Sequence, residues 1–129
     1  MARGFTQREG VDYDKTFSPV LQPALLRSLM AIAAKENWEI DQVDVKTAFL
    51  YGDLDEEIYL KLPDGSIRRL RKAIYGLKQA GRQFNKKFDQ TLKDFKMIRC
   101  SGDTCCYIRE VDGEPLIVLI HVDDALIFG

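Results

Sequence analysis

The last fifteen residues, PLIVLIHVDDALIFG, place two adjacent aspartates between two apolar runs. Each run is typical of a buried strand, so the aspartates fall where a hairpin turns. Asp123 and Asp124 suit a turn, because Asp side chains hydrogen-bond to nearby backbone. Two-residue hairpin loops nevertheless favour Asn-Gly or Asp-Gly, and two carboxylates about 4 Å apart repel each other by roughly 4 kcal/mol in a partly screened environment. A divalent cation would offset that repulsion, and magnesium prefers carboxylate oxygens.

A third carboxylate strengthens the metal interpretation. Asp44 interrupts the apolar positions of QVDVKTAFL, where a buried and unpaired charge would be costly. Placed at a strand end beside the hairpin, Asp44 would complete a cluster of three with Asp123 and Asp124. Three converging carboxylates can hold two magnesium ions, which is the equipment for in-line displacement at phosphorus.

The remaining pattern predicts an α+β fold, with two helices against a largely antiparallel sheet. One helix is expected over 23–36 and an amphipathic one over 80–95, with Phe84, Phe88, Leu92 and Phe95 on its buried face. A strand is expected over 38–45, followed by one helical turn in KTAFL. Two strands flank the turn residues PDG within 55–72, and three more are expected within 97–100, 105–111 and 115–122, with the Asp-Gly of VDGE between the last two.

Composition narrows the class of protein. A chain of 129 residues, 46% hydrophobic and 30% charged, is expected to form a single soluble domain over 1–129. No apolar run is long enough to span a membrane and no signal peptide opens the chain, so we expect an intracellular protein, cytoplasmic or nuclear and not secreted. Three cysteines with one histidine do not suggest a disulfide framework or a zinc site, and buried free thiols are expected.

Charge is distributed unevenly along the chain. Residues 61–99 hold twelve Lys and Arg against three Asp, while the other ninety residues hold seven basic and seventeen acidic residues. Such a segment indicates either a surface that faces a polyanion or a solvated helix face and strand, and charge alone favours the second interpretation.

Longer motifs resemble a known family. The stretches VDVKTAFLYGDLDEEIYLKLPDG, LRKAIYGLKQAGRQF and VLIHVDDALI together resemble the reverse transcriptase of Ty1/copia-type retrotransposons, and GFTQREGVDYDKTFSPV resembles the segment that precedes them. The resemblance covers nearly the whole chain in the family's order. It implies a right-hand polymerase palm with part of the fingers, truncated at both ends, acting as an RNA-directed DNA polymerase.

The resemblance also implies roles for particular residues. Asp44, Asp123 and Asp124 match the family's catalytic carboxylates, which with the backbone of Val45 would hold two Mg²⁺ ions. Phe49 matches the family's aromatic residue that excludes a sugar with a 2′-hydroxyl. Without the resemblance, Phe49 would be interpreted as an ordinary aromatic residue of the core. Gln79 matches the fingers glutamine near nucleotide and template. Implied partners are an RNA or DNA template with primer, deoxynucleoside triphosphates and the remainder of a polyprotein, thumb and RNase H included, with no membrane.

Two other interpretations compete with an active polymerase. A catalytically inactive remnant would keep the basic face and would only bind nucleic acid, without synthesis. Separately, we expect the isolated chain itself to be inactive. A small magnesium-dependent phosphohydrolase would share the carboxylates, but it would explain neither YGLKQ nor the basic segment. The sequence departs from the family at His121, where a tyrosine is usual.

Overall fold

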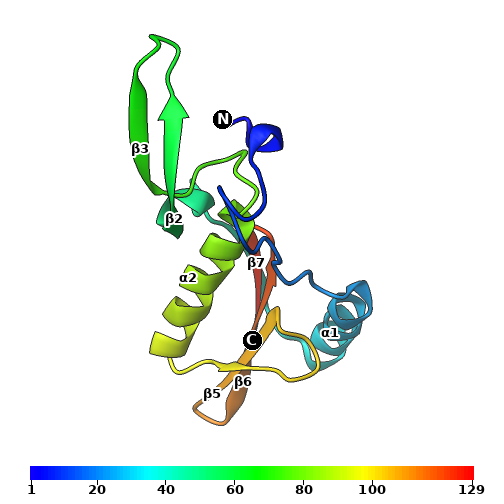
Figure 1. Ribbon diagram of the computed structural model, residues 1–129. Helices are drawn as coiled ribbons and strands as arrows, with labels where there is room; N and C mark the ends of the chain where they lie inside the picture. Colours follow the sequence, from blue (N-terminus) through cyan, green and yellow to red (C-terminus); the bar gives the residue numbers. More distant parts are fainter. The chain divides into compact units, whose positions relative to one another are not determined.

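The computed structural model describes residues 1–129 and contains two helices and two antiparallel sheets (Figure 1). The helices are α1 (Pro23–Glu36) and α2 (Ala80–Asp94), with short 3-10 turns η1 (Gly4–Thr6) and η2 (Ala48–Tyr51). The strands are β1 (Ile40–Asp44), β2 (Asp53–Lys61), β3 (Ile67–Lys72), β4 (Ile98–Arg99), β5 (Cys106–Val111), β6 (Glu114–His121) and β7 (Asp124–Phe128). The expected α+β class is confirmed, since both helices and the antiparallel pairing are present.

The chain divides into two compact units, each made from two separate stretches. Unit 1 comprises residues 1–18 and 47–88, and unit 2 comprises residues 19–46 and 89–129. The chain therefore passes between the units three times. The assignment of residues 1–129 to one domain stays a prediction.

Unit 2 is built on a five-stranded antiparallel sheet in the order β1-β7-β6-β5-β4. Helix α1 covers one face of this sheet, because Leu29 and Ala33 pack in one cluster with Ile117, Leu119 and Phe128. Pro23 occupies the first turn of α1, where a missing N–H costs nothing, and Asn37 ends the helix in the left-handed conformation. All four residues from Ile117 to Ile120 are buried, so β6 is covered on both faces.

Unit 1 contains the β2–β3 hairpin, which Figure 1 shows in green, and the N-terminal residues. Its core gathers small and aliphatic side chains from several segments: Ala2, Ile58, Ala73, Leu77 and Ala80. The turn between β2 and β3 includes Gly65 in a left-handed conformation, as the PDG stretch predicts. Asp112 and Gly113 likewise have positive φ between β5 and β6, which a type I′ hairpin turn requires.

The predicted apolar face of α2 is correct at its start and wrong at its end. Phe84 is buried and Phe88 and Leu92 are half-buried, but Phe95 is 63% exposed. The helix stops at Asp94, and Lys96 turns the chain through a left-handed conformation with φ of 63°. Phe95 therefore leaves the helical repeat on which its predicted burial depended. No helix in the chain has the length and apolar character needed to cross a membrane.

Candidate functional site

Strand pairing brings two of the three predicted catalytic aspartates together. In the antiparallel β1–β7 pair, Asp44 lies directly opposite Asp124. Directly opposed residues share one face of a sheet, so both carboxylates belong to the same face at the end of these strands. The Val45 N–H donates to the Asp123 carbonyl at 3.1 Å, which carries the pairing one step beyond β1. The backbone of Val45 thus lies beside the hairpin that carries Asp123.

The aspartates do not together form the hairpin tip. His121 pairs with Asp124, which leaves Val122 and Asp123 as the two-residue loop, and Asp124 begins β7. Val122 has a φ of 59° and Asp123 does not share the positive φ. A positive φ at the first loop position alone is the pattern of a type II′ turn, in which glycine is preferred. Valine is β-branched and rarely adopts this conformation, so the loop that presents Asp123 is strained.

The three carboxylates differ in their surroundings. Asp44 is exposed, whereas Asp123 and Asp124 are half-buried. Carboxylate oxygens are the ligands that magnesium prefers, so the chemistry of these side chains fits a magnesium site. No three His, Cys, Asp or Glu side chains in residues 1–129 are gathered closely enough to hold a metal ion. The structure therefore supplies a paired Asp44 and Asp124 with Asp123 in the adjoining loop, and metal binding by these residues stays a prediction.

Phe49 belongs to an aromatic cluster in unit 1. It lies on η2, half-buried, with its ring centroid 4.4 Å from that of Tyr75 and 6.2 Å from that of Phe84. The Phe84 ring meets Phe49 at 78°, close to the favourable edge-to-face geometry. Packing therefore fixes the orientation of Phe49, and its role as a sugar gate stays a prediction.

Gln79 is completely buried, and its amide is fully hydrogen-bonded within unit 1. Its Oε1 accepts from Gln7 Nε2 at 2.9 Å, and its own Nε2 donates to the Asp12 carbonyl at 3.0 Å and to Glu56 Oε2 at 3.4 Å. Both N–H groups of the amide are thus used by protein partners. In this conformation Gln79 ties the N-terminal segment to the rest of unit 1, and a contact with nucleotide or template stays a prediction.

Gln7 is a further residue of this arrangement that the sequence did not reveal. Besides its bond to Gln79, it accepts the Lys78 backbone N–H through Oε1 at 2.8 Å. The N-terminal segment also approaches Gly76 closely, since a Cβ on Gly76 would lie 2.0 Å from the Ala2 carbonyl oxygen. The glycine of YGLKQ is therefore required by this approach and by its φ of 98°. A side-chain contact across seventy-two residues leaves no local sequence pattern.

Comparison with known proteins decides the family. Residues 1–129 match the family model described as "Reverse transcriptase (RNA-dependent DNA polymerase)". The chain belongs to this family. It is 41% identical over its whole length to "Retrovirus-related Pol polyprotein from transposon TNT 1-94" of Nicotiana tabacum, of which it covers 10%. Similar relatives are the polyproteins from transposons RE2 and RE1 of Arabidopsis thaliana, 37% and 36% identical over the whole chain, of which it covers 9% each.

These matches confirm the resemblance to the reverse transcriptase of copia-type retrotransposons. The chain spans about a tenth of the length of the curated relatives it matches. No solved structure matches it. The assignment to the reverse transcriptase family therefore rests on sequence.

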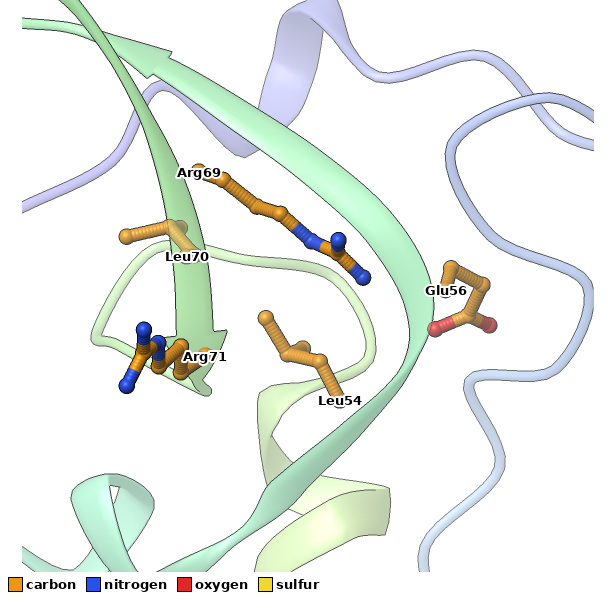
Figure 2. Close-up of a pocket in the computed structure, with 5 residues that line it drawn as sticks. All are labelled: Leu54, Glu56, Arg69, Leu70 and Arg71. Carbon is orange, nitrogen blue, oxygen red and sulfur yellow. The ribbon is translucent and has the colours of Figure 1, made fainter.

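The basic segment of this reverse transcriptase chain is partly neutralised by acidic residues of β2. Arg69, which reaches between the two strands of the β2–β3 hairpin (Figure 2), pairs with Glu57 at 3.1 Å, Lys72 pairs with Asp53, and Lys86 lies 3.4 Å from Asp55. These pairs are exposed, and such pairs contribute little to stability. They do reduce the positive charge available to a polyanion, which the count over residues 61–99 did not anticipate.

The three cysteines are free thiols in unit 2, as predicted. Cys105 and Cys106 are buried and Cys100 is half-buried, with its Sγ 3.3 Å from that of Cys106. Burial raises the pKa of Cys105 to about 11 and that of Cys106 to about 12. Both thiols thus stay protonated near neutral pH, which suits a role in packing.

Proposed function

We propose that this chain carries the catalytic carboxylates of an RNA-directed DNA polymerase encoded by a retrotransposon. The observation that supports it best is the direct pairing of Asp44 with Asp124, with Asp123 in the adjoining loop, in a chain of the reverse transcriptase family. Asp44, Asp123, Asp124 and the Val45 backbone would hold two magnesium ions. When bound, these ions supply charge neutralisation to an attacking hydroxyl and to a leaving pyrophosphate.

The other predicted residues would act on substrate. Phe49, whose ring is fixed by Tyr75 and Phe84, would lie against the incoming sugar and exclude a 2′-hydroxyl. Gln79 would act near the nucleotide by holding the N-terminal segment in place. Exposed basic residues would contact the phosphate backbone without reading sequence. The partners would be a primed RNA or DNA template, deoxynucleoside triphosphates and other parts of a polyprotein.

A primer-extension assay tests this proposal. In a polymerase polypeptide that contains these 129 residues, Asp44→Asn and Asp123→Asn should each lower extension by roughly a thousandfold, because metal-held charge stabilisation is worth several kcal/mol. Asp41→Asn is the matched control, since Asp41 lies on the same strand and pairs with Ile127 instead of an aspartate. Extension that survives Asp44→Asn would contradict the assignment, and so would an equal loss with Asp44→Asn and Asp41→Asn.

A second candidate function is that of an inactive remnant that binds nucleic acid. The absence of any three-side-chain metal group among residues 1–129 favours it. The same assay separates the two, because a remnant would bind primer and template in all variants and extend none of them.

A further inference from the structure

Two of the three cysteines are in contact, although the polymerase chemistry uses neither of them. Arg99 pairs with Tyr107 across β4 and β5, so Cys100 stands opposite Cys106 at the next step of the ladder. The Cys100 backbone N–H donates to the Cys106 carbonyl at 2.8 Å, so the strands are still paired at this point. The two Sγ atoms lie 3.3 Å apart. Both side chains therefore lie on one face of the strand pair, with their sulfur atoms together.

This position meets the geometric conditions for a disulfide bond. Directly opposed residues of antiparallel strands have Cα atoms about 4.5–5.5 Å apart, which lies inside the range of about 4.4–6.8 Å that disulfides span. The sulfur atoms of a disulfide are about 2 Å apart. The Sγ atoms of Cys100 and Cys106 would thus have to close from 3.3 Å to about 2 Å, a movement that rotation of the side chains can supply.

The third cysteine has a different neighbour. Whereas the Sγ of Cys106 meets that of Cys100, the Cys105 thiol faces the Asp103 carboxylate, which together with burial raises the Cys105 pKa to about 11. Asp103 Oδ1 also accepts the Cys105 backbone N–H at 2.8 Å. The arrangement therefore favours Cys106 over Cys105 as the partner of Cys100.

The loop between the paired cysteines reaches both solvent and the core. Residues 101–105 are mostly exposed and Cys100 is half-buried, so a small solute has access to the Cys100 sulfur. Asp103 is the buried polar residue of this loop, and its Oδ2 accepts the Gln22 backbone N–H at 2.9 Å. Gln22 directly precedes helix α1. The loop thus holds the start of α1, and a bond between Cys100 and Cys106 would close the loop at its base.

We propose that Cys100 and Cys106 form an oxidation site, at which hydrogen peroxide closes a reversible internal disulfide that fixes the 101–105 loop. The inference goes beyond the proposed function and does not depend on it. Peroxide transfers one oxygen atom to the Cys100 thiol, which becomes a sulfenic acid as one water leaves. The Cys106 sulfur then attacks the Cys100 sulfur, the S–O bond breaks, and the hydroxyl leaves with the Cys106 proton as a second water. Two thiols are oxidised by two electrons in total, and one peroxide is reduced to two waters.

Contact between the sulfur atoms offsets the low acidity of the second thiol. Burial raises the pKa of Cys106 to about 12, so little thiolate is present near neutral pH. A group held against the atom that it attacks nevertheless reacts as though its concentration were very high. Cys100, the more exposed of the two, meets the oxidant first, and Cys106 then has its target within 3.3 Å.

Differential labelling of the 129-residue chain tests the proposal. The reduced chain is treated with hydrogen peroxide, its remaining thiols are alkylated in denaturant, and the chain is then reduced and treated with a second alkylating reagent before mass spectrometry. The first label should lie on Cys105 alone, and the second label on Cys100 and Cys106. First label on all three cysteines, or on Cys106 with Cys105 protected, would overturn the proposal.

Serine variants identify the partners independently. Cys100→Ser should abolish peroxide-dependent protection of the other cysteines, whereas Cys105→Ser, the matched control beside Cys106, should leave the bond in place. Protection that survives Cys100→Ser would overturn the assignment, and so would a peroxide-dependent dimer on a non-reducing gel in place of the internal bond. The labelling of the wild-type chain decides the outcome even where a variant fails to fold.

Thermal unfolding tests whether the bond fixes the loop. The oxidised wild-type chain should unfold roughly 5–10 °C above the reduced chain, because a crosslink restricts the unfolded chain, and dithiothreitol should reverse the shift. Cys100→Ser treated in the same way should show no shift. An oxidised wild-type chain that unfolds no higher than the reduced chain would contradict the proposed fixing of the loop. None of these measurements involves primer extension, so failure here leaves the test of the aspartates unaffected.

Discussion

Val122 adopts a backbone conformation that a β-branched residue rarely takes, and it does so in the loop that presents Asp123. Its φ is 59° and its side chain is 54% exposed, so burial does not repay the strain. Strain of this kind persists where the surrounding structure imposes it, and it often accompanies functional sites. Here the β6–β7 pairing imposes it by closing the loop between His121 and Asp124.

Replacing Val122 with glycine should therefore not destabilise the chain. A left-handed conformation costs an L-residue about 1–2 kcal/mol, and glycine loses roughly 0.5–1 kcal/mol through backbone entropy. We expect Val122→Gly to leave the free energy of unfolding unchanged or to raise it by up to about 1 kcal/mol, measured by urea denaturation. Val111→Gly is the control, because Val111 ends β5 without a positive φ and should lose stability. A clear loss with Val122→Gly would show that the loop is unstrained.

The sequence singles out candidate site residues, but it predicts their surroundings only in part. Asp44, Asp123 and Asp124 stand out because charges interrupt apolar runs, and strand pairing then places Asp44 against Asp124. Turn propensity predicts both Asp123 and Asp124 at the tip of the last hairpin, because it does not fix the register of the strands. The pairing of His121 with Asp124 shifts the loop by one residue. The burial of Gln79 depends on Gln7 and Asp12, which sequence periodicity cannot connect to it.

Helix α2 shows what a periodic sequence pattern can predict about a helix and what it cannot. Its bounds were predicted to within one residue, since Phe84, Phe88 and Leu92 repeat at helical spacing. Phe95 continues the same spacing, yet the helix ends before it. Periodicity identifies a face but does not identify the residue at which tertiary contacts stop covering it.

Alanine substitution of Phe84 and of Phe95, the first and last aromatic residues of this predicted face, should change the free energy of unfolding by very different amounts. Phe84 is 3% exposed, so Phe84→Ala should lower the free energy of unfolding by about 3–5 kcal/mol. Phe95→Ala should change it by no more than about 0.5 kcal/mol, because an exposed side chain loses little packing. Chemical denaturation monitored by circular dichroism measures both. Similar losses in the two variants would mean that Phe95 is buried in solution.

The last turns of α2 are joined to the sheet by a charged network within unit 2. Asp89 accepts from the Tyr107 hydroxyl at 2.8 Å, from Lys93 Nζ at 2.7 Å and from Arg99 Nη2 at 2.9 Å. Partial burial raises the pKa of Asp89. The hydrogen bonds from Lys93 and Tyr107 and the charge of Arg99 lower this pKa by more, so the folded-state pKa lies below 3.8. The unfolded chain thus binds a proton more readily than the folded one.

This difference makes stability depend on pH in a defined window. The contribution of Asp89 is complete above the unfolded pKa near 3.8 and is lost as the pH falls through the lower folded value. Asp89→Asn should destabilise the chain by about 1–3 kcal/mol at pH 7 and flatten the loss of stability below about pH 4. Asp94→Asn, an exposed position on the same helix, is the control. Urea titrations from acid to neutral pH that show the same acid limb in wild type and Asp89→Asn would contradict this origin.

The chain as a whole separates the predicted residues between its two units. The aspartates lie in unit 2, and Phe49 and Gln79 lie in unit 1. Both units contain segments from the two halves of the sequence, so neither can be recognised from composition or from a linker. The α+β class could be predicted because it depends on local periodicity, whereas the division into units depends on contacts between distant segments.

Catalysis by the 129-residue chain depends on whether it can hold its reactants and metal ions in position. Synthesis requires metal ions, nucleotide and primer to be held in register at once, and such positioning can supply about 7–11 kcal/mol of the barrier. Asp44 and Asp124 are paired, but three ligands are not yet gathered around a metal position. Ordering them would have to be driven by ligand binding, at a cost in conformational entropy.

We therefore expect the isolated chain of residues 1–129 to bind primed template in a salt-sensitive way and to extend no primer. Binding requires only exposed cations such as Arg71, whose contacts with phosphate form without an ordered metal site. The measurement is incubation of the chain with primed template, deoxynucleotides and magnesium, with extension products resolved on a gel and binding measured in parallel. Products that appear with the wild-type chain and vanish with Asp123→Asn would show that the loop, strained at Val122, already holds Asp123 where catalysis needs it.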